Sequence, residues 1–317
     1  MSVRVVIVNW NAGELLTNCL RSIARYGVGV GVDEVVVVDN GSTDRSDQVD
    51  VPGLPLQIIR TGRNLGFAAA CNIGAQGATT PFLLFLNPDA ELRSGTLPTA
   101  LAHMIQLQSQ KVGVCGVRLE DRDGHVQHHT TNLPTARSIF NVDLFKTRFD
   151  HLSTRRVGHV IGAFYLIRRP LFEQLGGFDE RYFVYLEDLD LSLRVQRAGW
   201  GVEYLAEAAA YHLGGGTSEQ VKAHRLFYST RSRLIYAFKH FPGISPWSVA
   251  AVSLVAEPML RLARAASRKS GREFADTLRA YWWLWRDLPR IARLAHSARR
   301  ETGAVSTDRG ADRKVAP

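Results

Sequence analysis

Residues 82–89 read Phe-Leu-Leu-Phe-Leu-Asn-Pro-Asp, an apolar run that ends in polar turn residues. A short, wholly apolar segment is typical of a strand buried on both faces of a parallel sheet. Val3–Val8 and Glu34–Val38 have the same character, and residues 39–44 (Asp-Asn-Gly-Ser-Thr-Asp) follow the second directly. Ligands bind at the carboxyl ends of strands in open α/β sheets, so these polar residues are candidate site residues.

Helix patterns alternate with these strands. Gly13–Tyr26 places apolar residues on one face, and Gly66–Gly77 predicts a second helix after the short strand Leu56–Arg60. Glu187–Ala198 predicts a helix that begins with acidic residues, which suits its N-terminal dipole. The βαβ rhythm predicts an α/β fold with a parallel, twisted sheet and helices on both faces.

Charge is unevenly placed along the 317 residues, of which 45% are hydrophobic. Residues 261–317 hold 14 of the 39 basic and 6 of the 30 acidic residues, which accounts for most of the net charge of +9. A nucleic-acid footprint would extend across the folded face, so we expect no nucleic-acid partner. A basic segment that contains the aromatic cluster Tyr281–Trp285 fits an anionic membrane surface better.

Composition changes near Pro242-Gly243, so we expect three parts: a catalytic domain at 1–242, a basic, aromatic helical region at 243–300 and a disordered tail at 301–317. The longest apolar stretch, Trp247–Ala256, is too short to span a bilayer. The three cysteines are too scattered for a disulfide framework, and Cys19 and Cys71 are expected in the core. These features predict a cytosolic protein or one bound to a membrane surface.

The polar strand ends each have a functional and a structural interpretation. Asp89 could supply a carboxylate to a hard divalent cation that also binds a substrate phosphate. Asp39 and Asn40 could bond a nucleobase or ribose, whereas Asx residues also form turns and caps. Arg63-Asn64-Leu65-Gly66 precedes a helix whose N-terminus could attract phosphate, with a plain capped helix as the alternative.

The acidic segment 187–190 (Glu-Asp-Leu-Asp) is the candidate for proton transfer. A general base must be ionised and within hydrogen-bond reach of the attacking hydroxyl, which Glu187 and Asp188 at a helix start could satisfy. Asp190 is expected to cap this helix or to pair with Arg194 at i+4.

Histidines complete the set of candidates. His212, which precedes three glycines, could join a metal site, face a diphosphate or be structural. His125, His128 and His129 lack zinc spacing and predict a solvated hairpin around Asp123-Gly124.

In combination and order, these motifs resemble those of the family 2 glycosyltransferases with the GT-A fold, in particular the bacterial rhamnosyltransferase branch. The resemblance extends from residue 3 to about residue 240. The matching motifs are Val-Asn-Trp-Asn at 8–11, Val-Asp-Asn-Gly-Ser-Thr-Asp at 38–44, Arg-Asn-Leu-Gly-Phe-Ala at 63–68, Leu-Asn-Pro-Asp at 86–89, Gly-Gly-Phe-Asp-Glu-Arg-Tyr-Phe at 176–183 and Glu-Asp-Leu-Asp-Leu at 187–191.

The resemblance implies a role for each candidate. The donor would be a nucleotide diphosphate sugar, and Asp188, with Glu187 beside it, would be the catalytic base. Asp89 and His212 would hold Mn²⁺ or Mg²⁺. The nucleotide-sugar pocket would be lined by Val8, Asn9, Asn11, Asp39, Asn40, Arg63, Asn64, Gly66 and Asn87.

Two residues depart from the family pattern. Asn87 stands where many relatives carry the first Asp of an Asp-x-Asp pair, which implies a more weakly held metal. Asn40 stands where many users of uridine nucleotides carry Asp, which is compatible with a thymidine-type donor. The Gln-x-x-Arg-Trp signature of processive synthases is absent, so we expect one sugar per encounter.

The resulting hypothesis is an inverting, non-processive transfer to a hydroxyl of a lipid-linked saccharide in cell-envelope polysaccharide synthesis. Rhamnose from dTDP-rhamnose is the donor that the branch suggests. The C-terminal region would bind the cytoplasmic face of the membrane, or would serve as a homodimer interface. Two hypotheses compete with it. One is a nucleotidyltransferase, which would need a glycine-rich, basic loop for the triphosphate, and residues 9–14 do not form such a loop. The other is an inactive nucleotide-sugar-binding protein.

Overall fold

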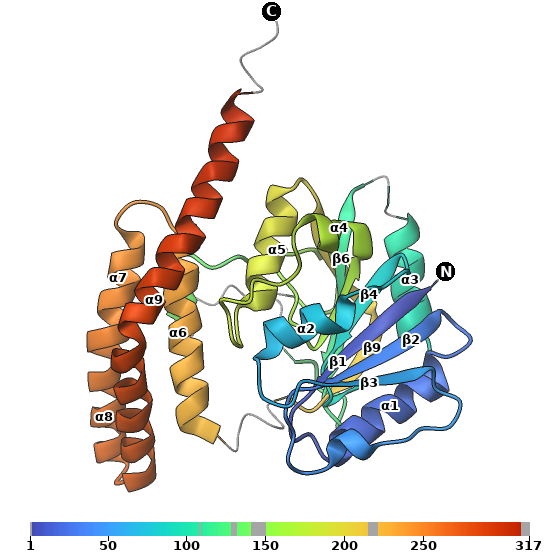
Figure 1. Ribbon diagram of the computed structural model, residues 1–317, viewed down its shortest axis with the longest axis horizontal. Coiled ribbons are helices and arrows are strands. Elements are labelled where there is room, and N and C mark those ends of the chain that lie inside the picture. Colours follow the sequence, from blue (N-terminus) through green and yellow to red (C-terminus); the bar gives the residue numbers. More distant parts are fainter. Residues whose placement is uncertain are drawn as a thin grey trace, which may run out of the picture. The chain divides into compact units, whose positions relative to one another are not determined.

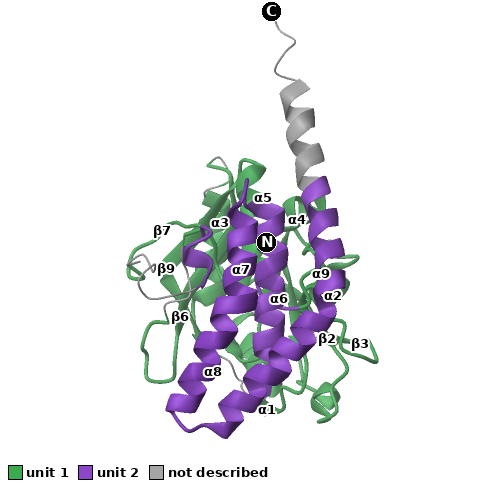
Figure 2. Cartoon of the chain, turned by 90° about the vertical axis from the view of Figure 1, so that its left-hand side faces the viewer, with its two compact units in different colours: residues 1–133, 147–183, 187–217 green, residues 134–146, 184–186, 218–317 purple. Residues whose placement is uncertain are grey.

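The computed structural model describes residues 2–106, 108, 110–127, 132–140, 150–214 and 221–311, with only the backbone of 301–311. The chain forms two compact units (Figure 2). The sheet unit comprises residues 1–133, 147–183 and 187–217, and the helical unit comprises residues 134–146, 184–186 and 218–317.

A single mixed sheet forms the centre of the sheet unit, in the order β3-β2-β1-β4-β8-β6-β9-β5, with β7 paired to β9 (Figure 1). Neighbouring strands from β3 to β4 are parallel, whereas β8 runs antiparallel to both β4 and β6. The strands are β1 Val3–Asn9, β2 Val32–Asp39, β3 Leu56–Arg60, β4 Phe82–Leu86, β5 Ala90–Leu92, β6 Val112–Glu120, β7 Arg155–Arg156, β8 Phe164–Arg168 and β9 Gly201–His212.

Helices cover both faces of this sheet because side chains on each central strand alternate between two buried layers. On β1, Val5 and Ile7 join one core cluster and Val6 joins the other. The first cluster includes residues of α1 and α3, and the second includes residues of α2, α4 and α5. These helices are α1 Glu14–Tyr26, α2 Phe67–Ala75, α3 Thr96–Gln106, α4 Arg169–Gln174 and α5 Glu187–Arg197.

Strand β1 lies at the point where the order of the parallel strands reverses, because β2 pairs with one of its edges and β4 with the other. Such a switch point opens a crevice at the carboxyl ends of the strands. The ends of β1 and β2 meet there, where Asn9 and Asp39 are register partners.

The predicted α/β sheet with helices on both faces is confirmed, but the expectation of a parallel sheet was too simple. β8 is antiparallel, and β5 and β7 also pair antiparallel with β9. Apolar runs predict burial, and they carry no information on strand direction. The hairpin expected at Asp123-Gly124 is present, with an antiparallel bridge between Glu120 and Val126.

The helical unit consists of α6 Lys222–His240, α7 Ser245–Ala251, a π-helical segment Val252–Ala256, α8 Glu257–Ser267 and α9 Gly271–Ala311. An ion pair of 3.0 Å between Arg231 and Asp287 joins α6 to α9, and one of 2.5 Å between Arg233 and Glu257 joins α6 to α8. Because α6 packs with these helices, the division between units precedes the boundary expected at residue 242. Helix α9 continues through Ala311, into the segment expected to be a disordered tail, and residues 312–317 lie outside the described part.

No helix among the described residues has both the length and the apolar character needed to cross a membrane. The three cysteines, Cys19, Cys71 and Cys115, are buried with free thiols, and burial was expected for Cys19 and Cys71. Burial raises the pKa of each thiol.

Candidate active site

The first polar cluster joins the ends of β1 and β2. Asn9 Nδ2 donates hydrogen bonds to Asp39 Oδ1 at 2.9 Å and to Ser46 Oγ at 2.8 Å. Ser42 N approaches the other oxygen of Asp39 at 3.3 Å. Asn9 is fully buried, so its side chain holds the carboxylate of Asp39 in place at the sheet edge.

Asn11 ties the loop after β1 to the loop after β2. Its backbone has a φ of 51°, its Oδ1 accepts from Thr43 N at 2.7 Å, and its N donates to Ser42 Oγ at 3.0 Å. Asn and Asp tolerate this left-handed conformation better than other residues with side chains. Val8 is buried as well, with 7% of its surface exposed, whereas Trp10 and Asn11 are partly exposed at the end of β1.

Asn40 clamps the loop that precedes α2. Its Nδ2 donates to Asn64 Oδ1 at 3.1 Å and to Gly66 O at 3.2 Å, while its Oδ1 accepts from Leu65 N at 2.8 Å. The side chain is 2% exposed and fully used by these bonds. Arg63 in the same loop is exposed, so its guanidinium is accessible to a ligand.

Gly66 brings this loop against the acidic segment. Phe67 N donates to Phe183 O at 2.6 Å, and a Cβ on Gly66 would lie 2.5 Å from the same oxygen. Gly66 also has a φ of +92°, a conformation that L side chains rarely adopt. The motif at 63–68 therefore contacts the motif at 176–183 through its backbone, and the rings of Phe67 and Phe178 also meet edge to face with centroids 6.4 Å apart.

Glu187 and Asp188 begin α5 in different environments. Asp188 is partly exposed, and its Oδ2 accepts a 2.9 Å hydrogen bond from Gly162 N. Glu187 is 5% exposed, and among the described residues its Oε2 has no hydrogen-bond partner. Burial, reinforced by the charge of Asp188, raises the pKa of Glu187 well above its usual range. Asp188 is therefore the accessible carboxylate, whereas the surroundings of Glu187 favour its neutral form.

The turn that leads into α5 is strained. Tyr185 and Leu186 both have left-handed backbones, with φ of 69° and 67°. Each such residue costs about 1–3 kcal/mol and persists only where the surroundings enforce it. Asp190, unlike Asp188, is fully buried. Its Oδ2 accepts a hydrogen bond of 2.7 Å from Arg194 Nε, so the pairing expected from the i+4 spacing is present.

Asp89 and His212 meet at the other acidic motif. Asp89 Oδ1 lies 3.4 Å from His212 Nε2, and both residues are buried. Their backbones are held in register, since Leu213 N donates to Asp89 O at 3.0 Å and Ala90 pairs with His212 between β5 and β9. The sequence placed both residues in a metal site, and the structure brings their donor atoms together.

Residues 162–163 connect the two acidic motifs. Gly162 N donates to Asp188, and the carbonyl of its neighbour Ala163 accepts from Asn87 N at 3.2 Å. The start of α5, which contains Asp188, and the segment 87–89, which contains Asp89, therefore bond to adjacent residues of one backbone stretch. Sequence analysis missed Gly162 and Ala163, because both act through the backbone and no motif marks them.

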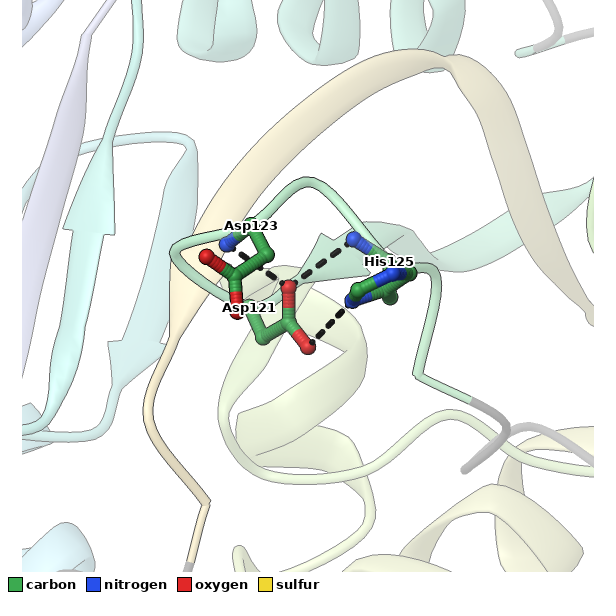
Figure 3. A group of neighbouring side chains, drawn as sticks. All are labelled: Asp121, Asp123 and His125. Atoms are coloured by element: carbon green, nitrogen blue, oxygen red, sulfur yellow. Dashed lines mark hydrogen bonds and ion pairs between the residues drawn. The ribbon is translucent and has the colours of Figure 1, made fainter.

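A second cluster of possible metal ligands lies in the hairpin after β6 (Figure 3). Asp121 Oδ1 accepts from the backbone N of Asp123 and of His125, each at 2.9 Å, and Asp121 Oδ2 lies 3.1 Å from His125 Nδ1. These bonds explain the cluster as a clasped turn, and the His125 side chain is 78% exposed, as a solvated hairpin predicts. His128 and His129 lie outside the described residues.

The sequence matches the profile of Glycosyl transferase family 2 over residues 4–176, more than half of the chain. The chain belongs to glycosyltransferase family 2. It is therefore a glycosyltransferase, and the family that the motifs indicated is confirmed.

Among known proteins, a Mycobacterium tuberculosis N-acetylglucosaminyl-diphospho-decaprenol L-rhamnosyltransferase is 30% identical over 74% of this chain and 84% of its own length. The O-antigen chain rhamnosyltransferase RfbN of Salmonella typhimurium is 26% identical over 67% of this chain and 66% of its own length.

A solved structure with a similar fold is the Pyrobaculum calidifontis mannosyltransferase PcManGT in complex with GDP-Man and Mn²⁺. It aligns with a TM-score of 0.52 at 19% identity, over 95% of this chain and 86% of that one. At this identity the likeness shows the fold, and it agrees with the GT-A architecture that the motifs indicated.

Proposed function

We propose that this glycosyltransferase moves one sugar, with inversion, from a nucleotide diphosphate sugar to a hydroxyl of a lipid-linked saccharide in cell-envelope glycan synthesis. The observation that carries the proposal is the junction at residues 162–163, which fastens Asp188 and the Asn87–Asp89 segment to one stretch of backbone. The base for the acceptor and the binding site for the leaving diphosphate must both lie within reach of one reacting carbon, on opposite sides of it. The bonds of Asp188 and Asn87 to neighbouring backbone residues support such an arrangement.

Asp188 is the proposed base. It would take the proton of the acceptor hydroxyl, whose oxygen then attacks the anomeric carbon as the bond from that carbon to the diphosphate oxygen breaks. A single displacement by this route inverts the anomeric centre. The partial exposure of Asp188 lets an acceptor reach it, and the bond from Gly162 N at 2.9 Å fixes its orientation. Glu187, which is buried, is assigned to support of that site.

Asp89 and His212 are the proposed ligands of a divalent cation. One oxygen and one imidazole nitrogen lie 3.4 Å apart, a donor set that suits Mn²⁺ better than Mg²⁺, which prefers oxygen alone. When bound, the cation would supply positive charge to the leaving diphosphate. The Mn²⁺ in the complex of the similarly folded mannosyltransferase supports this choice.

The nucleotide is proposed to lie over the ends of β1 and β2. Asp39 and the exposed Arg63 would contact it directly, with the backbone of Val8 and the side chains of Asn11, Asn64 and Asn87 lining the pocket. Asn9 and Asn40 are assigned to holding Asp39 and the loop at 63–66, because the Asn9 amide nitrogen and the whole Asn40 amide are bonded inside the protein. Gly66 would let the ligand approach the start of α2.

The identity of donor and acceptor is inferred from the relatives. Both rhamnosyltransferases support rhamnose, and dTDP-rhamnose is the donor that this branch of the family suggests. The name of the Mycobacterium tuberculosis protein supports a saccharide on a diphospho-lipid as acceptor. Such an acceptor lies in the membrane, so the enzyme must work at a membrane surface.

The helical unit has the features of a membrane-binding surface. Exposed apolar side chains recur through α7, the π-helical segment and the start of α8, and Leu260 is followed on the same helix face by Arg264 and Arg268 at steps of four. Apolar side chains beside arginines suit an anionic bilayer surface. The exposed apolar residues of this stretch are Ile244, Trp247, Val252, Val255, Met259 and Leu260. We propose peripheral binding to the cytoplasmic face, with a homodimer interface as the competing use.

Turnover of a nucleotide-sugar panel tests the whole proposal. With Mn²⁺ present, the purified protein should release nucleoside diphosphate from dTDP-rhamnose, and a membrane lipid extract should stimulate that release. Release from another donor would correct the sugar. Pyrophosphate release from a nucleoside triphosphate would instead indicate a nucleotidyltransferase, and donor binding without turnover at any lipid concentration would indicate an inactive binding protein.

A further inference from the structure

Gln127 holds His212 at two points. Its Nε2 donates to the backbone carbonyl of His212 at 2.7 Å, and its Oε1 lies 2.9 Å from the imidazole Nδ1. The carbonyl can only accept, so it determines which end of the Gln127 amide is nitrogen. The amide oxygen is thereby placed opposite Nδ1.

This contact selects one form of the imidazole. An amide oxygen can only accept, so Nδ1 must carry a proton. In the neutral ring the lone pair then lies on Nε2, which is 3.4 Å from Asp89 Oδ1. Two acceptor atoms face each other there with side chains only 6% and 9% exposed, an arrangement that a bound cation would stabilise.

We propose that Gln127 is a positioning residue that fixes the tautomer and orientation of His212, so that His212 Nε2 and Asp89 can together accept a divalent cation. The identity of that cation rests on the proposed function. Metal-binding histidines generally donate their other ring nitrogen to a neighbouring acceptor, and loss of that partner costs about 10–100-fold in metal affinity.

The clasped turn in Figure 3 supplies the support for Gln127. The bonds of Asp121 to residues 123 and 125 close the turn, and the returning chain places Gln127 N 2.8 Å from Leu119 O. The same short hairpin therefore sets the amide of Gln127 against the end of β9. In this interpretation Asp121 shapes the hairpin, through its bonds to the backbone of residues 123 and 125 and to the ring of His125, and the cation lies at Asp89 and His212.

Two variants of the full chain test the proposal. Gln127→Met keeps the length of the side chain and removes both bonds, whereas Gln127→Glu keeps an acceptor opposite Nδ1. Nitrogen NMR of ¹⁵N-histidine-labelled protein, with His212 assigned by the His212→Gln variant, reports which ring nitrogen is protonated. We expect Nδ1–H in the wild type and in Gln127→Glu, and a shift toward Nε2–H, donating to Asp89, in Gln127→Met.

Mn²⁺ binding, followed by electron paramagnetic resonance in the presence of dTDP, gives the second readout. Gln127→Met should bind Mn²⁺ about 10–100-fold more weakly than the wild type. An unchanged ring signal and affinity in Gln127→Met, or a doubly protonated ring in the metal-free wild type at neutral pH, would overturn the proposal.

Asp123→Asn is the matched control, since it removes a carboxylate of the turn and leaves Gln127 in place. Its Mn²⁺ affinity should equal that of the wild type, and a loss there would place the cation in the turn and overturn the proposal. The wild type could show a proton on Nδ1 of His212 and yet bind no Mn²⁺. That result would support the positioning role of Gln127 and would contradict only the metal assignment in the proposed function.

Discussion

The two units of this glycosyltransferase place apolar surface differently. In the sheet unit, β1, β2 and β4 bury nearly all of their apolar side chains on both faces, and the polar side chains at their ends bond one another. In the helical unit, residues 244–285 contain ten of the fourteen large apolar side chains that are exposed among the described residues. The difference teaches that the proposed catalytic and metal-binding residues all lie in the sheet unit, whereas most of the exposed apolar surface of the described residues lies in the helical unit.

The largest expected effect tests the chemistry of the sheet unit. Asp188→Asn should lower turnover by about 10²–10⁴-fold, the usual contribution of a general base, and should leave dTDP binding by calorimetry unchanged. Glu187→Gln should cost far less, because burial raises the pKa of Glu187 and so favours its neutral form, which Gln resembles. Near-normal turnover of Asp188→Asn would remove this carboxylate from the mechanism.

The next effect tests the surface of the helical unit. Met259 and Leu260 are 66% and 71% exposed, and an apolar side chain that leaves water fully contributes about 1.5–3 kcal/mol. Replacing both with Gln should therefore weaken flotation on anionic phosphatidylglycerol vesicles by at least about 10-fold, and turnover on a soluble acceptor should not change.

Leu152→Gln is the control for that experiment, since Leu152 is 74% exposed in the sheet unit and should not affect flotation. If the Met259 and Leu260 changes leave flotation intact and convert a dimer to a monomer in sedimentation, a second copy of the chain covers this face. That result would contradict membrane binding by the helical unit and would support the homodimer interface.

The smallest effect concerns the backbone contact at Gly66. Gly66→Ala combines a left-handed φ of +92° with a Cβ 2.5 Å from Phe183 O, so the free energy of unfolding in urea should fall by about 1–3 kcal/mol. Gly62 has a φ of +72° with nothing within 4 Å of its Cβ position, so Gly62→Ala should lose only the cost of the conformation, about 1–2 kcal/mol. If the free energy of unfolding falls equally in the two variants, the backbone near Phe183 moves to accommodate the new Cβ.

The sequence predicted the pieces of the site better than their connections. Apolar runs located β1, β2, β3 and β4, and the polar residues after them belong to the site, because both features are local. The antiparallel β8 and the long β9 were harder, since burial patterns say nothing of partner strands. Pro242-Gly243 marks the end of α6, and it could not reveal that α6 packs with α8 and α9.

Side-chain roles were the least accessible from sequence. Asn9 and Asn40 follow strands as ligand-binding residues do, yet their buried amides hold Asp39 and the loop at 63–66. Gln127 gave no signal, because its partner His212 lies 85 residues away and no motif surrounds it. Polarity at a strand end predicts a hydrogen-bonding role, and only the structure separates a bond to a ligand from a bond to a neighbouring loop.

The bonds of the site also differ in how far along the chain they reach. Asn9 with Asp39 and Asn40 with Asn64 span 30 and 24 residues, whereas Gln127 with His212 spans 85. Contacts between distant residues form more slowly than local ones, because they must close longer loops. During synthesis, the corner proposed for the nucleotide can form from early strands, whereas the pair proposed for the cation waits for the end of β9. A chain interrupted before α5 would contain Asn9, Asp39, Asn40 and Asn64 and would lack both the proposed base and His212.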